Sequence, residues 1–376
     1  MKKLGLYIHI PFCQKKCNYC DFLSAPANKQ VQIAYMDILQ KEIKEKSIEY
    51  KEYCVDTVFI GGGTPTCVPY ETIVDTMNVV KASFFITDDC EITMECNPGT
   101  VTKEALDNYR AAGINRLSIG LQSTHNGILK ELGRIHTFEQ FLETFNWARE
   151  AGFTNINVDL MSGLPNQTLE QYEDSLLEIL KLDVEHISSY SLIVEEGTPF
   201  YQLYEEDKLA LPDEETEREM YYLTKEKLMA AGLLRYEISN YAKEGYECKH
   251  NARYWIREDY LGVGLGASSM VNNVRFKNTE WLDEYLTDNK YMEKMDEQIL
   301  STTECMEEFM FLGLRMTKGV SKEKFFATFG SSMDEVYGNV VTKLKDQGLL
   351  EEEGGFVRLT EYGQDVSNKV WVEFLL

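Results

Sequence analysis

The sequence lacks an apolar run long enough to cross a membrane, although 44% of its 376 residues are hydrophobic. Because a spanning helix needs about 20 apolar residues, we predict no transmembrane segment. The N-terminus also lacks the features of a signal peptide, since His9 interrupts its apolar run and no small-residue cleavage site precedes Cys13. We therefore expect a cytoplasmic protein, for which peripheral membrane contact stays open.

Basic residues are scarce in this chain. Lys and Arg number 38 against 62 Asp and Glu, which gives a formal net charge of −24. Binding to a phosphate backbone requires clustered Lys and Arg, so we predict no nucleic-acid partner. Acidic runs such as residues 205–207 and 213–219 indicate solvated surface.

The sequence has no low-complexity segment and no solenoid repeat, but apolar strands and helical segments alternate along its first half. Strands are expected at residues 4–10, 54–60, 91–96, 116–121, 155–161 and 186–192. Such an alternation predicts an α/β fold with parallel strands, either an open doubly wound sheet or a complete or partial barrel. In both folds ligands bind beyond the carboxyl ends of the strands.

After about residue 200 the pattern changes. A long charged helix is expected over residues 214–231, and short helices from residue 301 precede a hairpin at residues 349–361. We predict a strand–helix domain at residues 1–232, a connecting region at 233–295 and a winged-helix-like domain at 296–376. The acidic charge disfavours a DNA-binding role for the last part.

The chain has nine cysteines, an odd number. Because no secretion signal is found, we expect their thiols to be reduced. Cys13, Cys17 and Cys20 follow the first expected strand within eight residues. Thiolates bind zinc and iron–sulfur clusters. No fourth Cys or His follows closely, as structural zinc would require, so a four-iron cluster with one open iron is favoured over zinc or unrelated buried thiols.

The ends of the later strands also carry candidate ligand-binding residues. Three glycines precede Thr64 and Pro65 after the second strand, where the backbone can approach a ligand closely, although a plain turn also uses glycine. Polar side chains follow at the ends of three strands and in one crossover: Glu95, Gln122, Asp159 and Arg134. Carboxylates there suit ribose hydroxyls or an ammonium group, and the arginine suits a carboxylate.

The pattern Cys13-x-x-x-Cys17-x-Tyr19-Cys20, followed by Gly-Gly-Gly-Thr-Pro at residues 61–65, resembles the radical S-adenosylmethionine (SAM) superfamily. In that family the open iron of a [4Fe-4S] cluster binds SAM, and an electron from the cluster cleaves SAM to a 5′-deoxyadenosyl radical. The resemblance implies a partial (β/α)6 TIM-like barrel, a [4Fe-4S] cluster on the three cysteines and SAM as cofactor.

Residues 7–13, 95–98, 116–122 and 157–165 resemble the HemN/HemW branch, which contains the coproporphyrinogen III dehydrogenase HemN and the haem chaperone HemW. The resemblance implies SAM contacts from these residues: Tyr7, Tyr19, Gly62, Gly63, Thr64, Glu95, Gln122, Arg134 and Asp159.

Two features favour the HemW type. Dehydrogenases of this branch carry an N-terminal arm and a further Cys two residues after the third, whereas this sequence begins close to its first strand and has Phe22 at that position. The motif His250-Asn251-x-x-Tyr254 resembles the haem-binding motif of HemW-type proteins, and imidazole is a good iron ligand.

Alternatives to this haem site remain. In one alternative His250 is a structural histidine that binds no iron. In another Cys248 competes with His250 as the iron ligand. Many relatives have Gly-x-Gly-Ala-His after the haem motif, but here Ser268 replaces the His.

The resemblance implies a chaperone that binds haem and transfers it to haem-accepting proteins, with an electron donor if the cluster turns over. The alternative is an oxygen-independent coproporphyrinogen III dehydrogenase, and a third interpretation makes SAM a regulatory signal. Whether the chain is an enzyme stays open.

Overall fold

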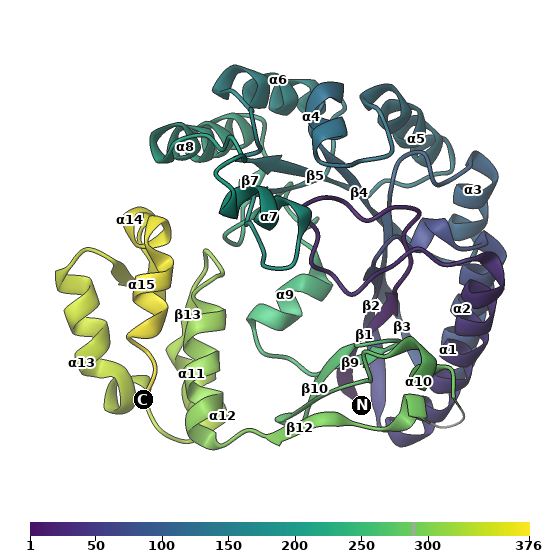
Figure 1. Cartoon of the computed structure of the whole chain (residues 1–376). Coiled ribbons are helices and arrows are strands. Elements are labelled where there is room, and N and C mark those ends of the chain that lie inside the picture. The colour runs from purple at the N-terminus through teal and green to yellow at the C-terminus, as the bar shows by residue number, and fades with distance from the viewer. Residues whose placement is uncertain (288–289) are drawn as a thin grey trace.

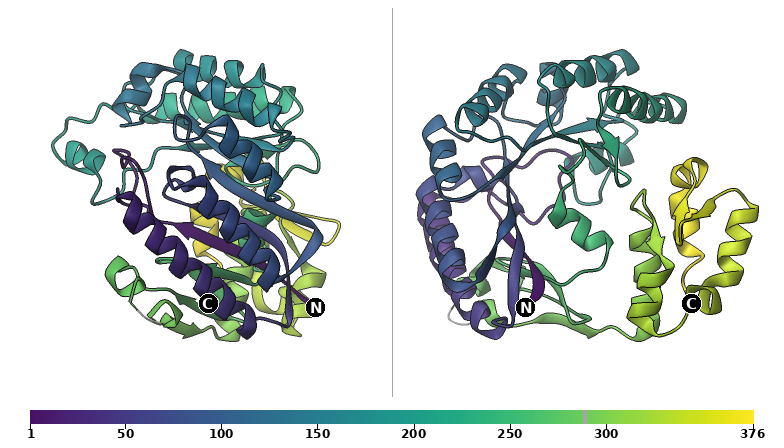
Figure 2. Two further views of the ribbon diagram at one scale, coloured as in Figure 1. Left: turned by 90° about the vertical axis from the view of Figure 1, so that its right-hand side faces the viewer. Right: turned by 180° about the vertical axis from the view of Figure 1, so that it is seen from behind.

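The computed structural model describes residues 1–287 and 290–376. A curved sheet forms the centre of the molecule, most of the helices cover its outer face, and a smaller C-terminal unit lies beside it (Figure 1). The same arrangement is seen from the other sides in Figure 2. The predicted α/β partial barrel with a C-terminal domain is therefore confirmed.

Six strands in sequence order form the centre of the sheet and pair in parallel. They are β1 (Lys2–Ile10), β2 (Tyr53–Gly62), β3 (Phe85–Cys96), β4 (Arg116–Gln122), β5 (Ile156–Ser162) and β6 (His186–Ser191). All six were predicted, although β3 begins earlier than expected. Because the strands are parallel, their carboxyl ends meet at one rim of the barrel.

Helices connect these strands on the outer face of the sheet (Figure 1). They are α1 (Lys29–Glu49), α2 (Tyr70–Ser83), α3 (Lys103–Ala111), α4 (Asn126–Glu131), α5 (Phe138–Glu150) and α6 (Leu169–Leu180). Thr137 and Thr168 are the N-caps of α5 and α6, and each belongs to a capping box. In each box the Thr side chain accepts from the backbone N–H of a Gln three residues later, and that Gln side chain accepts from the Thr N–H. These caps determine where α5 and α6 begin.

Both edges of the sheet come from the region between residues 233 and 299. At one edge β7 (Leu234–Arg235) and β8 (Asn240–Ala242) follow β6, and at the other β9 (Tyr260–Val263) pairs in parallel with β1. The sheet then continues through β10 (Ser268–Val271), β11 (Val274–Lys277) and β12 (Met295–Ile299). Within the described residues β12 and β7 remain edges, so the barrel is open.

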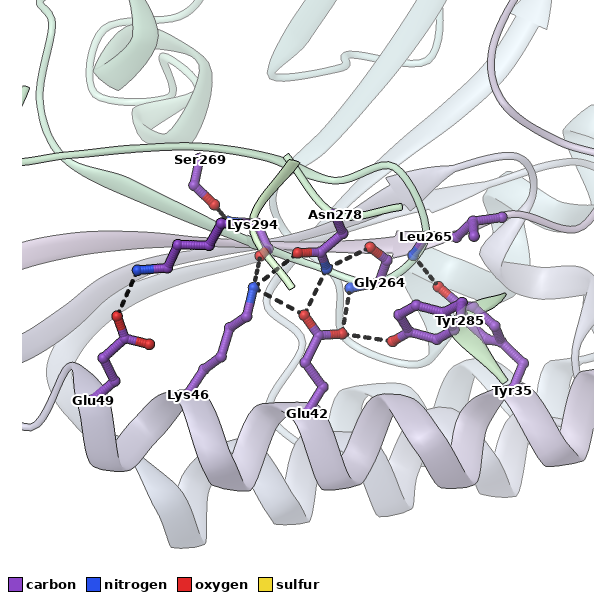
Figure 3. Close-up of polar contacts among 11 residues, drawn as sticks. Tyr35, Glu42, Lys46, Glu49, Gly264, Leu265, Ser269, Asn278, Tyr285 and Lys294 are labelled. Atoms are coloured by element: carbon purple, nitrogen blue, oxygen red, sulfur yellow. Dashed lines mark hydrogen bonds and ion pairs between the residues drawn. The ribbon is translucent and has the colours of Figure 1, made fainter. Parts of the chain in front are cut away.

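Helix α1 is joined to this edge extension by a buried polar network (Figure 3). The Glu42 side chain is 0% exposed and lies 3.0 Å from the Lys46 ammonium, which is 2% exposed. Glu42 also accepts hydrogen bonds from the Gly264 N–H, the Asn278 amide and the Tyr285 hydroxyl. These bonds compensate for the cost of burying two charges.

The remaining helices lie on the sheet or in the C-terminal unit. Beside the sheet are α7 (Pro199–Glu205), α8 (Glu214–Ala230), α9 (Lys249–Trp255) and α10 (Leu282–Tyr285). The C-terminal unit contains α11 (Thr302–Gly313), α12 (Lys322–Phe329), α13 (Met333–Asp346), α14 (Glu361–Asp365) and α15 (Ser367–Val372). None of the helices in residues 1–287 and 290–376 combines the length and apolarity needed to span a membrane.

The C-terminal unit has its own small sheet and core. Its strands β13 (Val320–Ser321), β14 (Leu350–Glu353) and β15 (Phe356–Leu359) form the wing that the sequence predicted as a hairpin. Met310, Phe325 and Tyr337 lie in a hydrophobic cluster separate from the core of the barrel. Arg315 contacts both parts, since its guanidinium lies 4.1 Å from the ring of Trp255 and 5.3 Å from that of Trp371.

Candidate functional site

A central cavity of about 330 Å³ extends from the rim of the barrel into its interior. It brings together most of the residues that the sequence predicted: Cys13, Cys17, Tyr19, Cys20, Gly62, Gly63, Thr64, Glu95, Gln122, Arg134, Asp159 and Asn251. Tyr7, His250 and Tyr254 do not line this cavity. The structure thus gathers the predicted SAM and cluster residues, Tyr7 excepted, in one place.

Residues 11–25 carry the three cysteines and are called the cysteine loop below. Backbone and side-chain hydrogen bonds hold this loop in place. The Ala25 N–H donates to the Pro11 carbonyl and the Cys13 N–H to the Ala25 carbonyl, which closes the loop at its base. Asn18 is bound to the end of α4, because its N–H donates to the Leu132 carbonyl at 2.9 Å and its side-chain amide to the Glu131 carbonyl at 2.8 Å. These bonds hold the three thiols beside the cavity.

The three thiols border the central cavity, and two of them have polar neighbours. Thr64 Oγ1 lies 3.4 Å from Cys13 Sγ, and Arg134 Nη1 lies 3.7 Å from Cys17 Sγ. Burial raises the pKa of the Cys20 thiol to about 11. In the described part of the chain no three His, Cys, Asp or Glu side chains converge as the ligands of one ion would. Soft thiolates spread around a cavity suit an iron–sulfur cluster.

The glycine segment after β2 packs directly against the cysteine loop. A Cβ atom on Gly63 would lie 2.6 Å from the Phe12 carbonyl oxygen, and Gly62 has a φ of +115°. The Thr64 N–H donates to that same Phe12 carbonyl at 2.7 Å. Glycine is therefore required at residue 63, because two backbone segments approach closely there. The contact attaches the cysteine loop to the end of β2.

Two carboxyl groups face the cavity from β3 and β5. Burial and the charge of Asp159 raise the pKa of Glu95 to about 8, which the hydrogen bond from the Gly62 N–H only partly opposes. Burial also raises the pKa of Asp159, although its carboxylate accepts a hydrogen bond of 2.7 Å from the Asn157 amide. Glu95 is therefore largely protonated at neutral pH and offers a hydrogen-bond donor to a ligand.

Arg134 and Gln122 complete the rim. Arg134 Nη2 donates to the Asn97 side-chain oxygen at 2.5 Å and to the Gly120 carbonyl at 2.6 Å, so its guanidinium is held in one orientation. Gln122 ends β4 with a φ of +75°, a strained conformation for a residue other than glycine, and its side chain accepts from the Tyr190 hydroxyl.

Tyr7 lies outside the cavity. Its hydroxyl is 2.9 Å from His9 Nδ1, and His9 Nε2 is 2.9 Å from the Leu23 carbonyl oxygen. Tyr7 therefore reaches the end of the cysteine loop through His9.

Helix α9 places the predicted haem motif in a different environment. His250 is 0% exposed, with Nδ1 2.9 Å from the Thr57 hydroxyl and Nε2 2.8 Å from the Tyr254 hydroxyl. Burial and the nearby Arg253 lower the pKa of His250 to about 3. The Glu91 carboxylate accepts from the His250 N–H at the start of the helix. Both ring nitrogens thus have partners, and neither faces a cavity.

A second cavity of about 250 Å³ lies between α9 and α11. It is lined by these residues: Tyr254, Trp255, Arg257, Tyr260, Met270, Arg275, Glu308 and Leu312. Arg257 and Arg275 both bind the Glu308 carboxylate at 2.8 Å. The haem motif indicated Tyr254, but the sequence gave no sign that the two arginines would lie beside it.

The sequence also missed the deeper lining of the central cavity. These residues are Arg116, Ser118, Asn157, Ser188, Ser239 and Asn240. The alternation along β4, β5 and β6 could have shown Arg116, Ser118, Asn157 and Ser188, because every second residue of a barrel strand points inward. Ser239 and Asn240 come from the later edge of the sheet, which the sequence did not predict.

Comparisons with known proteins agree with this geometry. Residues 7–179 match the family model described as the radical SAM superfamily, and residues 300–366 match the HemN C-terminal domain. The chain is 40% identical over 372 residues to "Heme chaperone HemW" of Bacillus subtilis and 34% identical over 378 residues to that of Escherichia coli. The first alignment covers 98% of both chains, and the second covers 99% of this chain and 98% of the relative.

A solved structure of the same shape is that of "Coproporphyrinogen III oxidase (HemN) from Escherichia coli". Its TM-score is 0.87 at 24% sequence identity, with 100% of this chain and 90% of the other covered. At that identity the likeness shows the fold alone.

Proposed function

The chain belongs to the HemW family of radical SAM proteins, and on this premise we propose that it binds haem and transfers it to haem-accepting proteins. The observation that carries the proposal is that the three cysteines and the haem-motif residue Tyr254 border different cavities. The central one gathers the cysteines and the polar rim, and the second presents aromatic side chains and arginines on the helix that carries the haem motif.

For the central cavity we propose that Cys13, Cys17 and Cys20 hold a [4Fe-4S] cluster, and that the rim binds SAM. When bound together, cluster and SAM supply electron-driven cleavage of the sulfonium. Glu95 and Asp159 suit the ribose hydroxyls and the ammonium group, and Arg134 suits the carboxylate. Tyr7 acts through His9 on the cysteine loop.

For haem we propose the second cavity. Tyr254 and Trp255 offer faces for the apolar macrocycle, and Arg257 and Arg275 offer cations for its propionates. His250 then serves as a positioning residue that holds the Tyr254 hydroxyl at 2.8 Å. Asn251 lies on the same helix but lines the central cavity, so α9 connects the two sites.

A haem titration of the full chain, reconstituted without oxygen, tests this site. Tyr254→Phe is expected to weaken haem binding about tenfold and to shift the Soret band, because it removes a polar contact within the cavity. His250→Ala should do the same by releasing Tyr254, and a Cys248→Ala control reports on the competing thiol. Tyr246→Phe, which changes a tyrosine outside both cavities, should leave the titration unchanged.

If Tyr254→Phe and His250→Ala both keep the affinity and spectrum of the unmodified protein, haem does not bind at this segment. Transfer is tested separately, by mixing the haem-loaded protein with apo-forms of haem proteins and measuring their spectra.

We further infer a cytoplasmic location, an electron-donor protein as partner and a domain boundary near residue 296. All nine cysteines are free thiols, as a reducing compartment maintains. Lys15 and Lys16 are exposed on the cysteine loop of an otherwise acidic chain and suit an acidic donor. The separate core of the C-terminal unit supports the boundary.

A further inference from the structure

Cys67 is a thiol that lies beside the cysteine loop but outside the proposed cluster site. It is the last residue of the short 3-10 helix η1 (Pro65–Cys67), which follows β2. Its thiol donates to the Phe12 carbonyl at 3.2 Å, and its side chain is half-buried and does not line the central cavity. A free cysteine packs like a small apolar residue, so its reactivity is what distinguishes it at this position.

The hydrogen bond to Phe12 brings Cys67 close to Cys13. A peptide oxygen lies about 2.8 Å from the next Cα atom, so the Cys67 sulfur is within about 6 Å of the Cys13 Cα atom. Thr64 contacts both residues, since its hydroxyl lies 3.4 Å from the Cys13 sulfur and its carbonyl accepts from the Cys67 N–H at 2.9 Å. Burial and the charge of Cys13 raise the pKa of Cys67 to about 12, which shows that the two thiols interact electrostatically.

The cysteine loop by itself has an odd number of thiols. Cys17 and Cys20 are joined by a turn in which the Cys20 N–H donates to the Cys17 carbonyl at 3.3 Å, so these two thiols can pair with each other when no cluster is bound. Cys13 is then left over. A thiol without a partner is oxidised stepwise to sulfinic and sulfonic acids, which thiol reductants do not reverse, whereas a disulfide is reversible. A fourth thiol beside Cys13 prevents that loss.

We propose that Cys67 forms a reversible disulfide with Cys13 when no cluster is bound, with hydrogen peroxide as the oxidant. The Cys13 thiol attacks the peroxide and becomes a sulfenic acid, and one water leaves. The Cys67 sulfur then displaces the hydroxyl group as a second water, and the S–S bond forms. Two thiols have lost two electrons, and peroxide has been reduced to two waters.

The disulfide keeps Cys13 available for a new cluster. Exchange with a cellular thiol restores both cysteines, so in a reducing compartment the bond is transient. The inference rests on the proposed cluster, because loss of that cluster is what frees Cys13.

Peptide mapping of the full chain tests the pairing. Iron is removed by a chelator without oxygen, a small excess of hydrogen peroxide is added, and free thiols are alkylated before digestion without reductant. Trypsin cleaves after Lys15 and Lys16 and thereby separates Cys13 from the other two cysteines of the loop. We expect the Cys13 peptide to be linked mainly to the Cys67 peptide, and the link to disappear after treatment with dithiothreitol.

Recovery of iron gives a second readout. After peroxide, dithiothreitol and anaerobic reconstitution, the unmodified chain should regain its iron and sulfide. Cys67→Ser keeps a hydroxyl that can donate to the Phe12 carbonyl, so it should load normally before peroxide but recover about threefold less iron afterwards, because Cys13 is overoxidised. The matched control is Cys54→Ala, which removes a thiol at the opposite end of β2 and should recover like the unmodified chain.

The outcomes separate this inference from the proposed cluster. If Cys13 is linked to Cys17 or Cys20, or is found as a sulfinic acid in the unmodified chain, the inference is wrong while the cluster stands. Equal recovery of iron by Cys67→Ser and the unmodified chain also overturns it. If the unmodified chain loads no iron but links Cys13 to Cys67, the proposed cluster fails and the disulfide stands. Should Cys67→Ser not load before peroxide, the peptide map of the unmodified chain decides alone.

Discussion

The central cavity and helix α9 use their polar groups in opposite ways. In the cavity the thiols of the cysteine loop, two carboxyl groups and the Arg116 guanidinium face open space with bonding capacity left over. At α9 the His250 ring and the Glu91 carboxylate, which comes from β3, both form internal hydrogen bonds. A ligand site keeps unsatisfied groups at some cost in stability, whereas a positioning element satisfies its own groups.

The largest expected effect is the loss of the cluster when one cysteine of the central cavity is removed. Cys13→Ala should abolish the four-iron cluster, because two thiolates from the loop leave too few ligands. Iron and sulfide analysis after anaerobic reconstitution measures the loss. Cys67→Ala is the control, since the Cys67 thiol donates to the Phe12 carbonyl and does not line the cavity. A full complement of iron and sulfide in Cys13→Ala would contradict the site.

Removing the His250 ring should cost stability instead. His250→Ala leaves a hole and two unsatisfied hydroxyls in the interior, so the free energy of unfolding should fall by about 2–4 kcal/mol in urea or thermal melts. Asn251→Ala on the same helix should cost less than 1 kcal/mol, roughly, since its side chain borders the cavity. Equal losses in the two variants would remove the distinction between the regions.

Glu95 should make stability depend on pH. Its folded pKa of about 8 lies above its ordinary value, so the folded state binds more protons than the unfolded chain between about pH 4.5 and 8. The free energy of unfolding should therefore fall as pH rises through this window, by up to about 1.4 kcal/mol per pH unit. Denaturant melts of the protein and of Glu95→Gln measure the difference. Parallel pH profiles would show that Glu95 is ionised throughout.

The smallest expected effect is an absence of turnover. Phe22 is 65% exposed and borders the central cavity. The resemblance described above implies a further Cys at this position in the dehydrogenases of the branch. We expect the reconstituted protein with SAM and coproporphyrinogen III to yield no protoporphyrinogen IX in an anaerobic assay. Product formed over many turnovers would restore the enzymatic interpretation.

Sequence patterns predicted the six central strands because each is an apolar run followed by polar or glycine residues at the rim. They did not predict the edge strands β9 to β12, which are short and acquire their regularity from pairing with β1 and with one another. The rim residues could be predicted because strand ends share one edge. The environment of His250 could not, since its partners Thr57 and Glu91 come from distant strands.

The buried network beneath α1 has a consequence for biosynthesis. Glu42 and Lys46 emerge early from the ribosome, but Asn278 and Tyr285, which satisfy Glu42, follow 236 and 243 residues later. Until then both charged side chains need water, so α1 cannot settle fully in its final place against the sheet. Closing so long a loop is slow, which makes the final packing of α1 against this edge a late step of folding. The cysteine loop, which lies between β1 and α1, is therefore exposed to solvent for as long as α1 is unsettled.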